Sequence, residues 1–208
     1  MKITAIDTIR LSERPNLLLA QIHTNEGLVG LGETSRGAAA VEAQIHDLTA
    51  PYLLGKDPLA IQQHSRQLSN SYLGFSSSSA EMRAASAIDI ALWDIFGQAT
   101  RAPIFQLLGG PSRDRIRAYN TCAGYDYNTR GVERRSITAD QPAPKSDGPY
   151  DDQVAFVHRP DELAHSLLSE GYTAMKIWPF DPFAHRSEGT LLRAEDLKMA
   201  LEPFRKIR

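Results

Sequence analysis

The stretch that decides the fold lies near the middle of the chain, at Ala80–Ala99, and reads AEMRAASAIDIALWDIFGQA. Apolar residues in it follow the i, i+3, i+4, i+7, i+8 spacing of one helix face: Ile88, Ala91, Leu92, Ile95 and Phe96. Ile90 and Trp93 widen this apolar surface, so we expect a long helix that is packed on several sides.

Three antiparallel strands are predicted ahead of this helix. Apolar positions between Ile3 and Leu11 indicate the first strand, and a polar loop at Ser12–Asn16 follows it. The other two strands, Leu17–Thr24 and Leu28–Glu33, flank a short loop in which Gly27 can take a positive φ. Further helices are predicted at Ala38–Thr49, Pro58–Tyr72 and Pro103–Leu108. Residues 1–112 therefore form an α+β domain, an antiparallel sheet plus helices.

The pattern changes to alternating strands and helices in residues 113–208. Strands are predicted at Arg115–Thr121 and Thr173–Trp178, and helices at Pro160–Glu170 and Ala194–Lys206. This order is typical of βα units with parallel strands. Residues 128–152 are polar, contain three prolines and are too long for an ordinary connection, so we expect an inserted loop there.

Composition excludes several classes of protein. The 208 residues carry a net charge of −2, which argues against a nucleic-acid partner, since such proteins show a basic excess. No run of about 18 apolar residues predicts a membrane span, and the first residues lack the pattern of a secretory signal. The only cysteine, Cys122, excludes an internal disulfide. We expect a globular, cytoplasmic protein.

The predicted strand Thr173–Trp178 carries the first candidate for chemistry. Side chains alternate along a strand, so Met175 and Ile177 share one face and Lys176 and Trp178 share the other. If helices cover the outside, Lys176 points inward near the carboxyl end of the strand, where α/β sheets and barrels place catalytic groups. A lysine there can act as a base or hold a carboxylate; the alternative is a strand-end lysine that reaches solvent.

Four segments along the chain carry a family resemblance: Gly30–Thr34 (GLGET), Ser86–Ile95 (SAIDIALWDI), Leu107–Gly110 (LLGG) and Ala174–Ile177 (AMKI). With them the chain resembles the mandelate racemase / muconate lactonizing branch of the enolase superfamily. The resemblance implies an α+β capping domain followed by a (β/α)8 barrel, of which this chain holds only the first two βα units. It also implies that magnesium stabilises an enediolate formed by removing the proton next to a carboxylate.

The resemblance assigns roles to two residues of the second barrel strand. Lys176 matches the first lysine of the family's Lys-x-Lys motif, and Trp178 occupies the place of the second lysine, which usually abstracts the proton. Because tryptophan cannot do so, the resemblance favours an acid-sugar dehydratase over a two-base racemase. In such an enzyme a His–Asp pair on the opposite side of the barrel is the base. Lys176 would then bind the carboxylate, and Trp178 would shape the pocket.

The resemblance also points to two loops of the capping domain that close over the barrel. Arg14 and Asn16 in the first loop, and Arg36 in the second, are candidates for contact with an acid substrate. For each of them the alternative is an ordinary solvated loop residue. Two acidic residues inside the long helix, Asp89 and Asp94, are expected to make hydrogen bonds within the domain rather than to take part in catalysis.

The magnesium ligands that the resemblance implies are not found in the predicted elements of this chain. In the family they are acidic residues on the third, fourth and fifth barrel strands, and only two barrel strands are predicted here, so we expect no magnesium on this chain alone. We expect this chain to be the N-terminal portion of a homo-oligomeric enzyme that acts on a small sugar acid. The isolated chain is expected to be inactive. Two alternatives remain: a non-catalytic binding or oligomerisation protein built on the capping domain, and a metal-independent enzyme that relies on Lys176.

Overall fold

The computed structural model describes residues 1–70, 79–124 and 151–208, which form two compact units. Unit 1 consists of residues 1–114, and unit 2 consists of the described residues from 115 onward. Each unit has its own cluster of buried apolar side chains. No helix in the described part of the chain is long and apolar enough to cross a membrane.

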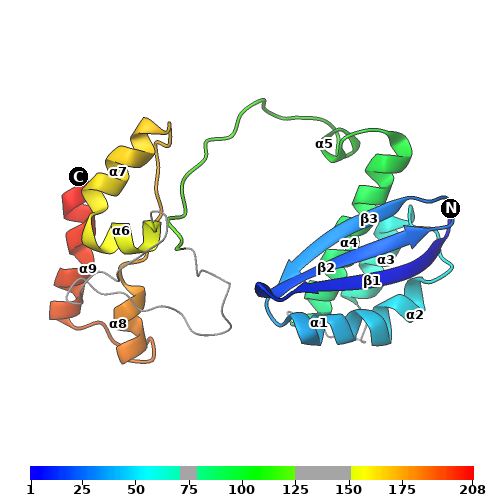
Figure 1. The fold of residues 1–208 in the computed structure, drawn as a ribbon, viewed down its shortest axis with the longest axis horizontal. Helices are drawn as coiled ribbons and strands as arrows, with labels where there is room; N and C mark the ends of the chain where they lie inside the picture. The colour runs from blue at the N-terminus through cyan, green and yellow to red at the C-terminus, as the bar shows by residue number, and fades with distance from the viewer. Residues whose placement is uncertain (71–78, 125–150) are drawn as a thin grey trace. The chain divides into compact units, whose positions relative to one another are not determined.

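A three-stranded antiparallel sheet forms one layer of unit 1 (Figure 1). Its strands are β1 (Ile3–Leu11), β2 (Arg14–Thr24) and β3 (Val29–Ser35), in the order β1-β2-β3. Alternate residues of β2 are buried and the residues between them are partly exposed, so one face of the sheet lies against the core. The α+β architecture predicted for this domain is confirmed.

The loop expected at Ser12–Asn16 is shorter in the structure. Leu11 of β1 already pairs with Arg14, so only Ser12 and Glu13 turn the chain, and Asn16 lies within β2. The prediction was wrong because polar residues such as Arg14 and Asn16 are typical of loops. Here they belong to the end of a strand that is not buried in the core.

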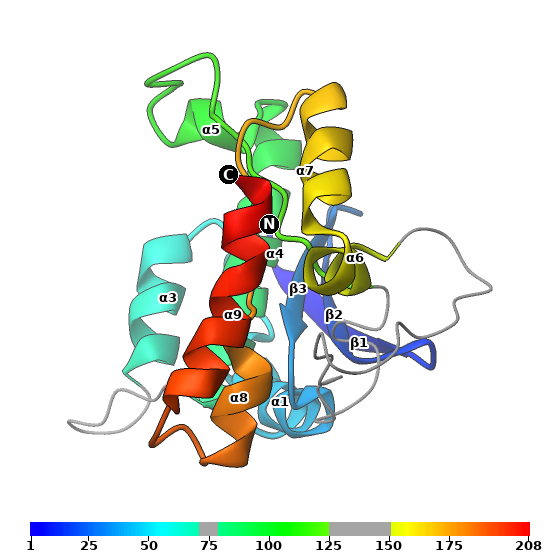
Figure 2. The ribbon, with the colours of Figure 1, turned by 90° about the vertical axis from the view of Figure 1, so that its left-hand side faces the viewer.

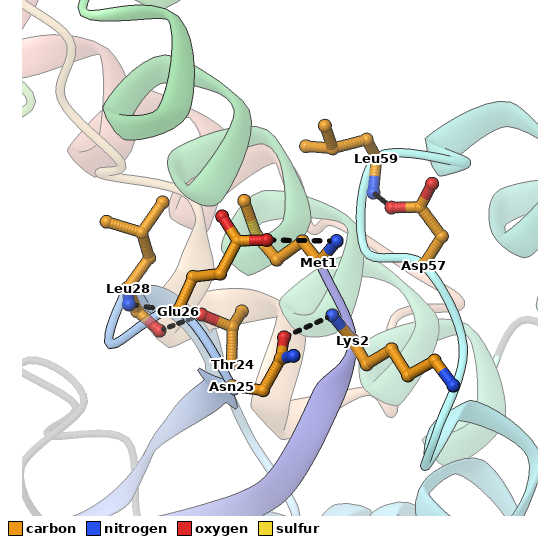
Figure 3. A network of polar contacts seen from close by, with 8 residues as sticks. All are labelled: Met1, Lys2, Thr24, Asn25, Glu26, Leu28, Asp57 and Leu59. Atoms are coloured by element: carbon orange, nitrogen blue, oxygen red, sulfur yellow. Dashed lines mark hydrogen bonds and ion pairs between the residues drawn. The ribbon is translucent and has the colours of Figure 1, made fainter.

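The second hairpin is anchored to the N-terminus (Figure 3). Gly27 has a φ of 81°, as the turn requires. The Met1 ammonium lies 3.1 Å from Glu26 Oε1, and the backbone nitrogen of Lys2 donates to Asn25 Oδ1 over 2.7 Å. An ion pair and a hydrogen bond therefore hold the N-terminus of the chain to the turn between β2 and β3.

Helices cover one face of this sheet. The helices of unit 1 are α1 (Ala38–Gln44), α2 (Ala50–Leu53), α3 (Ile61–Ser69), α4 (Ala80–Thr100) and α5 (Ile104–Leu107), with a π-helical segment, η1 (Ile45–Thr49), between α1 and α2. Of these, α1, α2 and α4 contact the strands, and α3 and α5 pack on α4. The helix expected to stop before Pro51 continues to Leu53, because Pro51 sits in the first turn of α2, where its missing N–H is tolerated.

The long helix α4 approaches β3 unusually closely. A Cβ added to Gly32 would lie 1.8 Å from the carbonyl oxygen of Ala87, and one added to Gly30 would lie 2.1 Å from that of Ala91. The two glycines therefore let the backbones of strand and helix touch. Ile90, expected on the packed surface of α4, is 50% exposed, so the helix is packed on fewer sides than predicted.

Unit 2 consists of helices joined by extended segments. The helices are α6 (Asp152–His158), α7 (Pro160–Ser169), α8 (Asp181–Arg186) and α9 (Ala194–Ile207). Of these, α7 and α9 pack side by side (Figure 2) and were predicted, whereas α6 and α8 were not. The inserted loop predicted at residues 128–152 lies outside the described residues except at its end, where Asp152 begins α6.

The two barrel strands predicted in unit 2 are not formed. Asn120 and Met175 instead make one isolated parallel bridge, in which the Asn120 nitrogen donates to the Ala174 oxygen over 3.1 Å. The Lys176 nitrogen donates to the Asn120 oxygen over 2.8 Å. The prediction placed the paired segments correctly but overestimated their pairing. Parallel ladders are weaker per residue than antiparallel ones and are normally stabilised by further strands on either side.

Candidate functional site

The Asn120–Met175 bridge brings two distant segments of unit 2 together. Arg117 reinforces it from the first segment: its Nε donates to Thr173 Oγ1 over 3.0 Å, and its Nη2 donates to the Thr173 carbonyl oxygen over 2.7 Å. Two backbone and two side-chain hydrogen bonds therefore fix residues 117–120 against residues 173–176.

Lys176 extends from the second segment and is exposed. Its ammonium lies over two aromatic rings, with Nζ 5.2 Å from the centroid of the Trp178 ring and 5.8 Å from that of Tyr119. Both distances are within the range of cation–π attraction. The structure thus presents one cation at an aromatic surface beside the bridge.

The other face of the same segment packs on the core of unit 2. Met175 and Ile177 contact the buried cluster that α6 and α7 contribute, as the alternation of side chains predicts. Trp178 reaches the same cluster, and its ring meets that of Phe156 edge-on with centroids 6.3 Å apart. Trp178 therefore connects the surface around Lys176 to the packed interior.

Cys122 belongs to the buried cluster of unit 2 and is fully buried. Its backbone has a φ of 54°, and its nitrogen donates to Asn120 Oδ1 over 2.6 Å. Burial, together with the negative charge of Asp152, raises the pKa of the Cys122 thiol from 9.0 to about 11. The residue is therefore a small buried side chain rather than a nucleophile, as expected.

Asp152 is an acidic residue whose charge acts on Cys122. Burial raises the pKa of its carboxyl, and a hydrogen bond with the Asn120 side chain acts in the opposite direction. The neighbouring Asp151 caps α6, since its Oδ1 accepts from the Val154 nitrogen over 3.0 Å. Both aspartates thus have local roles at the start of α6.

Three predicted site residues belong to unit 1. The backbone nitrogen of Arg36 donates to the Asn16 carbonyl oxygen over 2.8 Å, so these two residues are neighbours. Arg36 has a left-handed φ of 70°, and its side chain is exposed, as is that of Arg14 near the start of β2. The structure brings Arg36 to Asn16, while Lys176 and Trp178 belong to the other unit.

The acidic residues of α4 make internal hydrogen bonds. Asp94 Oδ2 accepts from the Leu31 nitrogen over 2.8 Å and from Gln98 Nε2 over 3.1 Å, which ties α4 to the edge of β3. Burial raises the pKa of Asp89, whose carboxyl bonds to Ser65 of α3. Both residues therefore have the structural role expected from the sequence.

The described residues do not fit a magnesium site. Across residues 1–70, 79–124 and 151–208, no three His, Cys, Asp or Glu side chains lie close enough together to hold a metal ion. Magnesium prefers carboxylate and water oxygens in octahedral geometry, and the carboxylate of Asp152, which acts electrostatically on Cys122, is hydrogen-bonded to Asn120.

Sequence reasoning missed two residues that define this surface, Arg117 and Tyr119. The signal was available, because side chains alternate in an extended segment, and Arg117 and Tyr119 share one face of the predicted strand Arg115–Thr121. The residues around the bridge can hold an anion at the Lys176 ammonium and place an apolar group against the Trp178 and Tyr119 rings.

A known family matches the first half of the chain. The family described as "Mandelate racemase / muconate lactonizing enzyme, N-terminal domain" matches residues 4–109. These residues include the sheet of unit 1 except for Ile3 at the start of β1, the glycines of β3 and helix α4.

Known proteins resemble the chain in sequence and in structure. A D-galactonate dehydratase of Verminephrobacter eiseniae is 42% identical over 127 residues, which cover 60% of this chain and 32% of that protein. An enolase of the mandelate racemase subgroup from Agrobacterium tumefaciens has a TM-score of 0.79 and 48% identity, covering 100% of this chain and 47% of its own. An enolase from Pantoea ananatis, solved with bound D-gluconate and magnesium, has a TM-score of 0.60 and 29% identity over 85% of this chain and 36% of its own.

The chain is shorter than all three of these proteins. It spans about a third of the curated relative and less than half of either solved chain.

Proposed function

The chain belongs to the mandelate racemase / muconate lactonizing enzyme family, and from this membership we propose that it is the N-terminal part of a magnesium-dependent acid-sugar dehydratase. Such an enzyme removes the proton next to the substrate carboxylate and expels the β-hydroxyl with the help of an acid. The observation that carries the proposal is the 42% identity to a D-galactonate dehydratase over 60% of this chain.

Two residues of unit 2 take part in substrate binding under this proposal. Lys176 presents an exposed ammonium, which suits a substrate carboxylate as an electrostatic partner. Trp178 forms an apolar wall beside it, held by its edge contact with Phe156. Tryptophan has no group that can abstract a proton, so the position two residues after Lys176 cannot supply a base. This supports dehydration rather than two-base racemisation.

Unit 1 has the role of a capping domain under the same proposal. Arg14 and Arg36 present exposed guanidinium groups that can reach an acid substrate, and Asn16 supports Arg36 through its backbone carbonyl. Magnesium would supply charge stabilisation to the enediolate in the whole enzyme. Since the described residues contain no donor set for it, we assign no step of the reaction on this chain to the metal.

The coding sequence beyond codon 208 tests the proposal directly. It predicts an in-frame continuation with acidic residues at the carboxyl ends of three successive βα strands, which would supply the ligands of the metal. A stop codon immediately after Arg208 would contradict the proposal. It would favour the alternative of a non-catalytic protein that uses the capping domain for binding or self-association.

A further inference from the structure

Tyr119 is a residue that neither the sequence pattern nor the family motifs assign to the site. Its ring is 53% exposed, so burial of apolar surface alone does not account for its position. The Lys176 Nζ lies 5.8 Å from the centroid of this ring, and Trp178 supplies a second ring at 5.2 Å. The two rings come from segments more than 50 residues apart in the chain.

The backbone around the bridge brings the two residues that carry these rings close to Lys176. Tyr119 directly precedes Asn120, whose backbone exchanges hydrogen bonds with Ala174 and Lys176 over 3.1 and 2.8 Å. Trp178 is anchored on its other side by Phe156 and the core of unit 2. The Trp178 ring is therefore set by packing and the Tyr119 backbone by the bridge, whereas the lysine side chain has four rotatable bonds.

We propose that Tyr119 is a positioning residue for Lys176, which it holds together with Trp178 in a two-ring cation clamp at the bridge. The negative faces of the rings attract the ammonium and restrict the rotamers that it can adopt. The charge is then presented in one place, as binding a substrate carboxylate requires. This role rests on the proposed function, but the clamp itself is a property of the chain and can be tested without turnover.

The clamp has a spectroscopic signature in the 208-residue chain. Aromatic ring currents shift the ε-methylene protons of Lys176 upfield of those of the exposed Lys198. Lys56, whose Nζ lies 4.5 Å from the Tyr52 ring centroid in unit 1, is an internal positive control. In Tyr119→Leu we expect Lys176 to lose part of its upfield shift while Lys56 is unchanged, and Tyr119→Phe should retain the shift because the ring remains.

An unchanged Lys176 shift in Tyr119→Leu would overturn the proposal. If that variant does not fold, the wild-type chain still decides, because the clamp requires nuclear Overhauser contacts between the Lys176 ε-methylene and the Tyr119 ring, and their absence also overturns it. Titration with D-galactonate tests the proposed function separately. Sugar-acid-dependent shifts of the Trp178 and Tyr119 ring protons that Lys176→Met removes and Lys198→Met retains support carboxylate binding. Their absence, with the ring-current shift intact, contradicts the function and leaves the clamp standing.

Discussion

The segment Gly30–Thr34 contains two glycines because helix α4 leaves no room for side chains at these two positions of β3. At Gly30 and Gly32 the carbonyl oxygens of Ala91 and Ala87 occupy the space that a side chain would need. Those contacts are with helix backbone, which cannot rotate away as a flexible side chain can. The glycines and the small residues of α4 therefore form one matched surface.

Gly32→Ala should destabilise unit 1 strongly. The added methyl would meet the Ala87 oxygen at 1.8 Å, so α4 must move, and overpacking of this kind costs about 1–3 kcal/mol or more. Gly97→Ala in α4 is the matched control. Its new methyl would meet the movable end of Ile104 at 3.1 Å and the Ala102 carbonyl oxygen at 3.2 Å, which are much looser contacts than the one at Gly32, and helix propensity favours alanine by about 1 kcal/mol.

The measurement is urea unfolding followed by Trp93 emission in a Trp178→Phe background. We expect a marked fall in the free energy of unfolding for Gly32→Ala and a change of less than about 1 kcal/mol for Gly97→Ala. Equal effects of the two substitutions would show that the close approach of α4 to β3 is not what constrains Gly32.

The buried thiol of Cys122 predicts a pH dependence for unit 2. Its pKa is about 11 in the folded chain, against 9.0 for an unperturbed thiol, so the native state keeps the proton more tightly than the unfolded state. Below pH 9 both states hold the proton, and the thiol adds no pH dependence. Between pH 9 and 11 the unfolded state loses it first, so stability falls as pH rises.

Comparison with Cys122→Ala isolates this effect from other groups that titrate in the same range. Urea unfolding followed by Trp178 emission in a Trp93→Phe background should give a stability difference, wild type minus variant, that is constant from pH 7 to 8.5 and declines by pH 10. A difference that stays constant to pH 10 would mean that the thiol is not held in its neutral form.

At the scale of elements, the sequence predicted those parts of the fold that repeat a pattern. Helix α4 was placed to within a residue because its apolar spacing runs over several turns. The first strand followed from apolar positions between Ile3 and Leu11, and the other two from apolar runs on either side of Gly27. Helices α6 and α8 are seven and six residues long, too short for a helical period to show. The π-helical segment η1 depends on backbone hydrogen bonding that composition does not encode.

The candidate site was predictable only in part, for a related reason. Alternation correctly put Met175 and Ile177 against the helices and Lys176 away from them, but it was wrong for Trp178, which packs on the same cluster. It could not reveal that Tyr119 would meet Lys176, because that contact depends on the register between two segments far apart in the chain. Register between such segments is set by tertiary pairing.

Hydrogen exchange should distinguish the sheet of unit 1 from the bridge of unit 2. Amides of the central strand β2 are bonded within a continuous ladder on both sides and should exchange slowly. The Asn120 and Lys176 amides belong to an isolated bridge and should exchange much faster, and faster still in Arg117→Ala, which loses the contacts with Thr173. Protection at Lys176 equal to that in β2 would show that a continuous parallel sheet forms here.

At the scale of the whole molecule, the two units differ in the size of their cores and in the amount of sheet that they contain. Unit 1 has a sheet, a helical layer and a core of buried residues, and the family match covers most of it. Unit 2 has a smaller core and a single parallel bridge. In solved relatives of the same family the matched region is less than half of the chain. The central claim is therefore that Lys176, proposed above to bind a substrate carboxylate, belongs to a chain whose described residues lack a metal site for the proposed reaction.

Turnover by the purified 208-residue chain tests this claim most directly. The chain is incubated with magnesium and a panel of aldonic and aldaric acids that includes D-galactonate and D-gluconate, and the keto-acid product of dehydration is measured. We expect no product above the rate without protein, because no magnesium ligand set exists among the described residues. Magnesium-dependent dehydration of any of these acids, abolished by Lys176→Met, would contradict it.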